Sequence, residues 1–357
     1  VLALFLLPVA LFYGLLGTVL LSSRELAPLS EVVDAAVNGS LVLYGSAYHE
    51  NFTAFKLRCA QQKRAKLLVL GTSRSMQLRG AFFTEKSFFN AGGGVKNGED
   101  YERFLRELSP EALPDTLLLV LDQNMFNAQW AMENRTEGLA LEEVPLKKDV
   151  LARVGTSYGD RKFAIHKTLL PQKGVYGLAA AGRGSGFTAD GSYVYGKAAE
   201  ENLSSPERAF AETYRNIDFS RARFVYGDAP SEEALGWMKS LLSYCAEQHI
   251  AVIGILPPFA PSVYEKMVSS GHYRYIEILP EILKTLFADS GASCYDYSYI
   301  QNTVSAQYLD GYHGGDAVYA QMLLDLAARD PDIAPLIDGN AISVLLARGG
   351  HNPRVLP

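Results

Sequence analysis

Three residue types that together make a nucleophilic enzyme occur at two widely separated places in the chain. Ser73 follows an apolar run in "LLVLGTSRSMQL", and Asp310 stands three residues before His313 in "QYLDGYHGGDAVYAQML". A serine hydroxyl is a weak nucleophile until an imidazole accepts its proton, and the imidazole works best when a carboxylate fixes its tautomer. The order Ser…Asp-x-x-His therefore predicts a catalytic triad, provided the fold brings the two segments together.

Two further segments could stabilise the negative charge that such chemistry develops. Gly92, in "FNAGGG", could bring its main-chain N–H close to a ligand, and Asn124, in "LDQNMF", could offer a side-chain amide. Together with the N–H of Ser73, these groups would form an oxyanion hole. Each donor of this kind is typically worth about 3 kcal/mol of the reaction barrier.

Other polar side chains beside these motifs are secondary candidates. Arg74 has a planar fork of donors that could bind a uronate or a phosphate, or it could be an ordinary surface or ion-paired arginine. Asp122 could contact substrate as a rival carboxylate, or it could hold a loop through a hydrogen bond or salt bridge. Ser75 would fall in the first helical turn after Ser73, where we expect a structural role.

The elements that must position these residues alternate between apolar strands and helices. Continuous apolar runs, typical of buried parallel strands, are found in "AKLLVLGTS", "DTLLLVLDQNMF" and "IAVIGILPPF", with shorter ones at 87–90 and in "SCYDYS". Helical spacing separates them in "EEALGWMKSLLSYCAEQH" and "YIEILPEILKTLFADSG", and near 98–108 and 315–328. This alternation predicts an α/β fold with a doubly wound parallel sheet and helices on both faces.

The rest of the chain divides by composition. The first 21 residues carry no charge, and about 20 apolar residues can cross a bilayer as a helix. We expect a transmembrane anchor at 1–22, a stalk and leading helix at 23–60, the α/β domain at 61–329, and a weakly patterned tail at 330–357. A Gly-, Ser- and Tyr-rich insertion at about 127–230 would lie over the carboxyl edge of the sheet, either as the specificity element or as a long loop without function.

Composition disfavours several classes of protein. With 33 Lys and Arg against 39 Asp and Glu, the net charge of -6 argues against nucleic-acid binding. The three cysteines, Cys59, Cys245 and Cys294, are too few for a disulfide framework or a zinc site. A Cys245–Cys294 bridge would be compatible with an oxidising compartment, but we expect three free thiols. The sequence contains no metal-ligand motif, and we expect no cofactor.

The motifs resemble the four sequence blocks of the SGNH (GDSL-like) hydrolase superfamily, which supply Ser, Gly, Asn and a D-x-x-H pair in that order. The resemblance spans residues 66–325 without the inserted region, and it rests on Ser73 in "GTS", Gly92 in "NAGGG", Asn124 in "LDQN", and Asp310 with His313 in "DGYH". It implies the three-layer, flavodoxin-like arrangement of that superfamily. It also implies a serine esterase or acyltransferase activity.

Two positions depart from the family pattern. Thr72 replaces the Asp of "GDS", and Asp122 replaces the usual Gly before the Asn of the third block. With the apolar N-terminus, these departures make the chain most similar to the membrane-anchored branch that modifies the cell envelope. That branch includes proteins of teichoic-acid D-alanylation and of O-acetylation of alginate-like polysaccharides.

The resemblance implies a bacterial single-pass protein of the plasma membrane with an extracytoplasmic catalytic domain. Ser73 would attack an acyl ester, His313 would act as base, and Asp310 would orient the imidazole. The substrate would be an envelope polysaccharide or a teichoic-acid-like polymer, and a membrane-bound O-acyltransferase would be a partner. Two alternatives stay open: a plain carbohydrate esterase (deacetylase), and a catalytically silent accessory protein that binds glycan or an acyltransferase.

Overall fold

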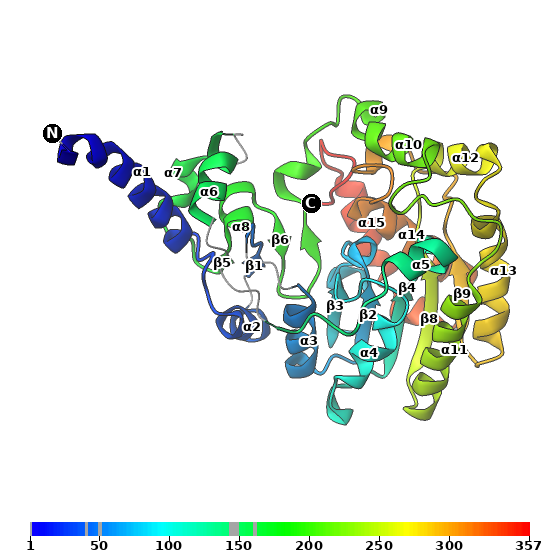
Figure 1. Ribbon diagram of the computed structural model, residues 1–357. Coiled ribbons are helices and arrows are strands. Elements are labelled where there is room, and N and C mark those ends of the chain that lie inside the picture. Colours follow the sequence, from blue (N-terminus) through cyan, green and yellow to red (C-terminus); the bar gives the residue numbers. More distant parts are fainter. Residues whose placement is uncertain (1, 40–41, 49–51, 143–149, 160–162) are drawn as a thin grey trace. The chain divides into compact units, whose positions relative to one another are not determined.

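The computed structural model describes residues 2–39, 42–48, 52–142, 150–159 and 163–357, and the chain forms two compact units (Figure 1). Unit 1 comprises Val1–Phe55, Leu141–Ala189 and Tyr193–Ala198. Unit 2 comprises Lys56–Ala140, Asp190–Ser192 and Ala199–Pro357. Each unit has a sheet of its own, and all the candidate site residues lie in unit 2.

Unit 2 contains a five-stranded parallel sheet. Its strands, in the order β3-β2-β4-β8-β9, are β3 (Phe88–Gly92), β2 (Leu67–Gly71), β4 (Thr116–Val120), β8 (Ala251–Leu256) and β9 (Ser293–Asp296). Every pairing within the sheet is parallel. The predicted α/β class with a parallel sheet is confirmed. Because β2 lies between β3 and β4, the strand order reverses there, and such a switch point leaves a crevice at the carboxyl ends of the strands.

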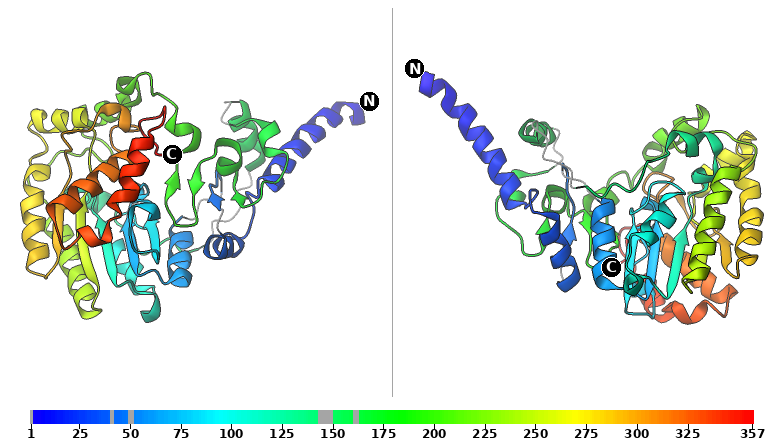
Figure 2. Two further views of the ribbon diagram at one scale, coloured as in Figure 1. Left: turned by 180° about the vertical axis from the view of Figure 1, so that it is seen from behind. Right: turned by 60° about the horizontal axis from the view of Figure 1, so that its bottom comes forward.

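Both faces of this sheet are covered by helices. On one face, Leu67, Val69 and Leu118 join a buried cluster with residues of α14 (Asp316–Arg329). On the other face, α11 (Glu232–Glu247) packs against β8. Figure 1 shows α11 in front of the sheet, and Figure 2 shows α14 covering it from behind. All five residues of β2 are buried, which explains why its sequence is continuously apolar rather than alternating.

The remaining elements of unit 2 surround the sheet or end its strands. The helix α3 (Phe52–Lys63) begins in unit 1 and ends in unit 2. The other helices are α4 (Asp100–Arg106), α5 (Ala128–Glu133), α9 (Pro206–Ala209), α10 (Ala211–Asp218), α12 (Pro261–Ser270), α13 (Arg274–Ala288) and α15 (Gly339–Arg348). The short 3-10 turns are η1 (Ser73–Ser75), η2 (Gly80–Phe82), η3 (Pro110–Ala112), η4 (Gln123–Phe126), η6 (Ser305–Gln307) and η7 (Ala334–Leu336).

The segment 330–357, predicted as a weakly patterned tail, is part of the core of unit 2. It contains η7 and α15, and Ile333, Ile337, Ile342 and Leu356 are buried in the same cluster as α14. The prediction was wrong because these residues come from several short elements, each of which buries only one or two apolar side chains. Such a segment shows no helical or strand period in its sequence.

Unit 1 combines residues that the sequence assigned to a stalk and to an insertion. Its sheet has the order β5-β1-β6-β7, with β1 (Leu43–Tyr44), β5 (Val175–Tyr176), β6 (Gly186–Phe187) and β7 (Tyr193–Val194). Its helices are α1 (Leu2–Ser22), α2 (Leu29–Asn38), α6 (Val150–Gly159), α7 (Ile165–Thr168) and α8 (Leu178–Arg183), and η5 (Gly196–Ala199) follows β7. The predicted stalk is therefore corrected: β1 pairs with strands from the predicted insertion, while α5, α9 and α10 of that insertion belong to unit 2.

The N-terminal helix α1 contributes to the core of unit 1. Near its end, Leu16, Val19 and Leu20 are buried in a cluster with Val154 of α6 and Leu178 of α8. This part of its apolar surface therefore contacts protein. Within the ranges that the structure describes, no helix has both the length and the apolar character needed to cross a bilayer. The predicted transmembrane anchor over 1–22 falls on α1, whose last turns pack in unit 1.

Candidate active site

The predicted site residues lie where β2 and β4 end. Ser73 is the first residue of η1, directly after β2, and Asn124 lies in η4, directly after β4. Asp310 and His313 lie on the loop between η6 and α14. Because β2 and β4 are neighbours in the sheet, Ser73 and Asn124 both lie at the switch point, where α/β folds bind their ligands.

Ser73, His313 and Asp310 form one chain of hydrogen bonds. Ser73 Oγ lies 2.8 Å from Nε2 of His313, although the two residues are 240 positions apart in the sequence. On the other side of the ring, His313 Nδ1 lies 2.8 Å from Asp310 Oδ2. Ser73 is partly exposed, and the His313 side chain is 19% exposed, so a substrate can reach both. This geometry allows the imidazole to take the hydroxyl proton while the carboxylate holds the opposite nitrogen.

Asp310 also builds the turn that presents His313. Its Oδ1 accepts the main-chain N–H groups of Tyr312 at 3.0 Å and of His313 at 2.8 Å. Burial alone would raise the pKa of the Asp310 carboxyl, but the charge and hydrogen bonds of His313 and the two N–H donors together lower it below its ordinary value. Asp310 is therefore a carboxylate at any pH near neutrality.

The two departures from the family pattern contact each other. Thr72 caps η1 by accepting the N–H of Arg74, and its hydroxyl donates to Asp122 Oδ2 at 2.6 Å. Thr72 thus contacts a carboxylate that comes from the neighbouring strand end, at position 122. This bond joins the turn that carries Ser73 to the turn that carries Asn124.

Tyr312, inside the D-x-x-H motif, links the same groups and was not predicted. Its Oη lies 2.9 Å from Asp122 Oδ2 and 2.7 Å from Asn124 Oδ1, and its proton is shared between these acceptors. Its ring meets the His313 imidazole edge to face, with centroids 5.1 Å apart. Burial, followed by the charge of Asp122, raises the pKa of Tyr312 well above its usual range. The only sequence signal is its place beside His313, where one side chain must face inward if the other faces the substrate.

Gly92 does not offer its N–H as predicted. That group donates to Asn90 Oδ1 at 2.6 Å. A Cβ at position 92 would lie 2.5 Å from Ser75 Oγ and 2.9 Å from the main-chain nitrogen of Met76, so glycine is needed for the close approach of η1 to β3. The prediction is corrected: Gly92 allows the close approach of the turn that carries Ser73, and its N–H is already bonded to Asn90.

The other two predicted donors are free of protein acceptors. In the part of the chain that the structure describes, neither the Ser73 N–H nor Asn124 Nδ2 makes a hydrogen bond. Tyr312 binds Oδ1 of Asn124 and thereby directs Nδ2 to the opposite side of the amide. The site can therefore supply two donors to an oxyanion.

Arg74 and Asp122 are buried, so the predicted role of each in substrate binding is wrong. Arg74 is 1% exposed; it donates to Gln123 Oε1 at 2.6 Å and to the Pro257 carbonyl at 2.9 Å. Its guanidinium lies 4.4 Å from the ring centroid of Tyr312, a distance typical of cation–π contact. Asp122, 2% exposed, instead holds the loop through hydrogen bonds, which was the alternative. Ser75 has the expected structural role, since its Oγ donates to the Thr72 carbonyl.

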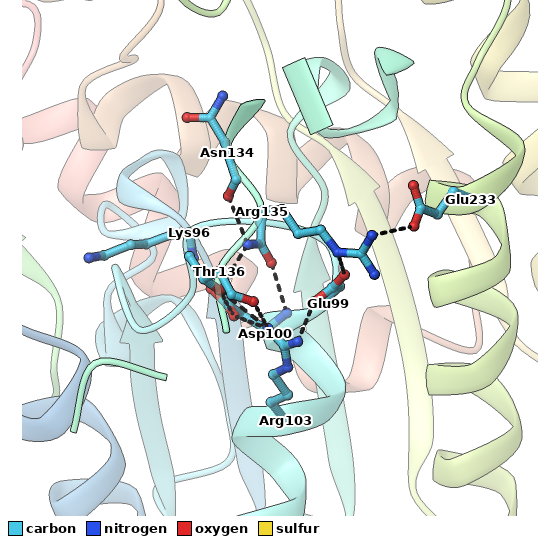
Figure 3. Close-up of polar contacts among 9 residues, drawn as sticks. Lys96, Glu99, Asp100, Arg103, Asn134, Arg135, Thr136 and Glu233 are labelled. Atoms are coloured by element: carbon cyan, nitrogen blue, oxygen red, sulfur yellow. Dashed lines mark hydrogen bonds and ion pairs between the residues drawn. The ribbon is translucent and has the colours of Figure 1, made fainter. Parts of the chain in front are cut away.

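A second polar region of unit 2 carries charged residues but no free charge. A hollow of about 320 Å³ is lined in part by Glu99, Arg103, Arg135 and Trp237. Arg135 reaches Glu99 at 3.0 Å and Glu233 at 3.1 Å, and Arg103 pairs with Glu99 as well (Figure 3). Arg106, which also lines the hollow, pairs with Glu102. Among the described residues, the hollow therefore has no guanidinium left to bind an anionic ligand.

Potential metal ligands form no cluster in the described residues, and the cysteines are unpaired there. The described residues contain no group of three or more His, Cys, Asp or Glu side chains that could hold a metal ion. Cys59, Cys245 and Cys294 are free, as expected, and burial raises the pKa of each to about 12. Comparison of the chain with protein-family models, with curated proteins and with solved structures finds no match.

Proposed function

We propose that this protein is an SGNH-like serine esterase or O-acyltransferase that acts on acyl esters of a cell-envelope polysaccharide or a teichoic-acid-like polymer outside the cytoplasm. The observation that carries the proposal is the continuous chain from Ser73 through His313 to Asp310, with both contacts at 2.8 Å. Ser73 would attack the acyl carbonyl while His313 takes its proton. The oxyanion would be bound by the N–H of Ser73 and by Nδ2 of Asn124.

The resulting acyl-enzyme has two fates. His313 first returns its proton to the departing alcohol oxygen, and it then activates either a sugar hydroxyl or a water molecule for attack on the acyl carbon. The first route is transfer and the second is plain carbohydrate esterase activity. The partial exposure of Ser73 and His313 favours entry of water, so we expect the isolated protein to release free acid.

An active enzyme is better supported than a silent glycan-binding or acyltransferase-binding protein. A protein that kept only the fold would need neither the alignment of His313 with Ser73 nor the two main-chain bonds that fix Asp310. Nor would it need Tyr312 to turn the Asn124 amide. A complete relay of this kind is expected where proton transfer is used.

Labelling with a fluorophosphonate tests this function. The wild-type protein should form a covalent adduct, and Ser73→Ala should form none, because only an activated serine reacts with this reagent. Ser75→Ala is the matched control, since Ser75 lies two residues away in the same turn and is fully buried. We expect the control to label like wild type. Absence of a wild-type adduct, or an equal adduct on Ser73→Ala, would show that the enzyme assignment is wrong.

The fate of the acyl group needs a second measurement. Acetylated oligosaccharide, incubated with and without an unacetylated acceptor, separates the two routes by mass spectrometry. Release of acetate with no acetylated acceptor would identify a deacetylase, whereas a shift of mass to the acceptor would identify a transferase.

A further inference from the structure

We propose that Arg223 binds an anionic group of the substrate, a carboxylate or a phosphate, beside the triad. This inference rests on the proposed function, and it further specifies that the substrate carries a negative charge near the ester. Arg223 belongs to the segment between α10 and α11, in unit 2, which no motif of the sequence marks.

Arg223 lies at the site through its contact with Tyr312. Its guanidinium carbon is 5.2 Å from the centroid of the Tyr312 ring, and that ring is 5.1 Å from the His313 ring. The guanidinium and the imidazole can therefore be no farther apart than the sum of these two distances. An anionic group within a sugar or two of the scissile ester is within reach of such a cation.

Arg223 differs from the other arginines described above in being both exposed and unpaired. Arg74 is buried with both of its terminal nitrogens bonded, and Arg103 and Arg135 face carboxylates (Figure 3). Arg223 is exposed, and no carboxylate in the described ranges of the chain lies within ion-pair distance of it. Its donors are therefore available to a ligand.

The backbone that carries Arg223 adopts a costly conformation. Ser220 and Ala222 have φ values of 51° and 54°, in the left-handed region that residues with a Cβ seldom adopt. After Arg223 the chain is held firmly: Phe224 is buried against the Tyr312 ring, and the Tyr273 hydroxyl donates to its carbonyl at 2.7 Å. The surrounding residues therefore hold a strained segment in place, and this segment carries an unpaired cation at the candidate active site. Strain of this kind is often found where a protein binds a ligand.

The chemistry of the Arg223 guanidinium limits the classes of ligand that it can bind. A guanidinium offers parallel N–H donors that match the paired oxygens of a carboxylate or a phosphate, and it gives little to a neutral hydroxyl. The expected substrate is therefore an acylated sugar or polyol that carries one of these anions near the ester.

Three acetyl esters test the proposal. O-acetylated methyl glucoside is neutral, O-acetylated methyl glucuronoside carries a carboxylate, and O-acetylated glucose 6-phosphate carries a phosphate. Acetate release by wild type, Arg223→Gln, Arg223→Lys and Arg221→Gln gives kcat and KM for each ester. Arg221→Gln is the matched control, because it removes another exposed cation from the same loop.

Arg223→Gln should raise KM for at least one anionic ester by about tenfold or more, as expected for a hydrogen bond to a charged group, and leave the neutral ester unchanged. Arg223→Lys should fall between wild type and Gln, and Arg221→Gln should match wild type. The ester that responds identifies the anion. An active wild type with no preference for either anionic ester, or an equal loss in Arg221→Gln, would overturn this proposal alone.

Two controls keep the result interpretable. Labelling of Ser73 by fluorophosphonate at the wild-type rate shows that the site of each Arg223 variant is intact. If wild type neither labels nor releases acetate from any ester, the proposed function fails, and the role of Arg223 fails with it.

Discussion

The candidate site has two layers that differ in exposure and in how fully their polar groups are bonded. The buried layer consists of Thr72, Arg74, Asp122, Gln123 and Tyr312. The exposed layer consists of Ser73, Asp310, His313 and Arg223. Apart from Thr72, which is partly exposed but bonded to Asp122, the members of the buried layer are at most 4% exposed and bond mainly one another or main-chain carbonyls. Among the described residues, only Nε of Arg74 and Oδ1 of Asp122 in this layer lack a hydrogen-bond partner. The exposed layer keeps donors and acceptors that only a ligand could use.

This difference assigns distinct tasks to the layers. The buried layer fixes the turns after β2 and β4 through bonds such as Thr72 to Asp122 and Arg74 to Gln123. Its contribution should appear mainly in the free energy of unfolding, because a buried group that loses its partner is costly. The exposed layer should contribute mainly to the reaction rate. Variants of the two layers can test this separation.

The largest effect is expected for His313→Ala, in the exposed layer. Without the imidazole, the Ser73 hydroxyl has no base, and loss of a triad member typically slows the reaction at least about 1,000-fold. Acetate release measures the rate, and urea unfolding should show a loss of only about 1 kcal/mol, because the partly exposed His313 gives up two hydrogen bonds whose partners water can reach. An inactive variant that is also strongly destabilised would contradict the separation of the layers.

Arg74→Met should give the opposite result. Methionine keeps most of the volume but removes the donors to Gln123 Oε1 and to the Pro257 carbonyl, so we expect a loss of about 3 kcal/mol in the free energy of unfolding. Urea denaturation measures it, with the exposed Arg221→Met as control, for which a change under about 0.5 kcal/mol is expected. Equal stability of the two variants would show that Arg74 is not structural.

The bond between Thr72 and Asp122 should have an intermediate effect. In a double-mutant cycle of Thr72→Val and Asp122→Asn, we expect a coupling energy of about 1 kcal/mol in unfolding, because the two side chains are in direct contact. The cycle should be measured at neutral pH by urea denaturation. A coupling energy near zero would mean that the two departures from the family pattern are independent of each other.

The exposed layer was easier to anticipate from sequence than the buried one, with Arg223 as the exception. Strands β2 and β4 are buried on both faces, so their apolar runs are unambiguous, and the positions of Ser73 and His313 follow from order and strand ends. The inward direction of Arg74 is different, because it depends on the ring of Tyr312, far along the chain. A contact between residues so far apart in the chain cannot be predicted from the sequence around either of them.

Competing local partners and short elements explain the other errors. Gly92 was assigned to the oxyanion hole from its place in a Gly-rich turn. The error arose because nothing in the sequence shows that the side chain of Asn90, two residues earlier, accepts its N–H. The strands of unit 1 contain two residues each, too few to show a period of two. In α1, a run of apolar residues looks the same whether it meets lipid or, as Leu16 does, a buried cluster of protein side chains.

The smallest expected effect belongs to Asp310 and depends on pH. Because its pKa is lower in the folded protein than in the unfolded chain, its ionised form stabilises the fold, and this contribution is complete at pH values above the ordinary value of about 4. It should fade as the pH falls from about 4 toward the lowered pKa. The side chain is 45% exposed and therefore screened, so we expect less than about 1 kcal/mol.

Asp310→Asn removes this titration and allows it to be measured. The difference in unfolding free energy between wild type and Asp310→Asn should be constant from pH 5 to 7 and should shrink between about pH 4 and pH 2.5. Asp325→Asn, which changes an exposed carboxylate on α14, serves as control. A difference that stays constant down to pH 2.5 would mean that the turn presenting His313 is held without the charge of Asp310, and one that grows would mean that folding raises the Asp310 pKa.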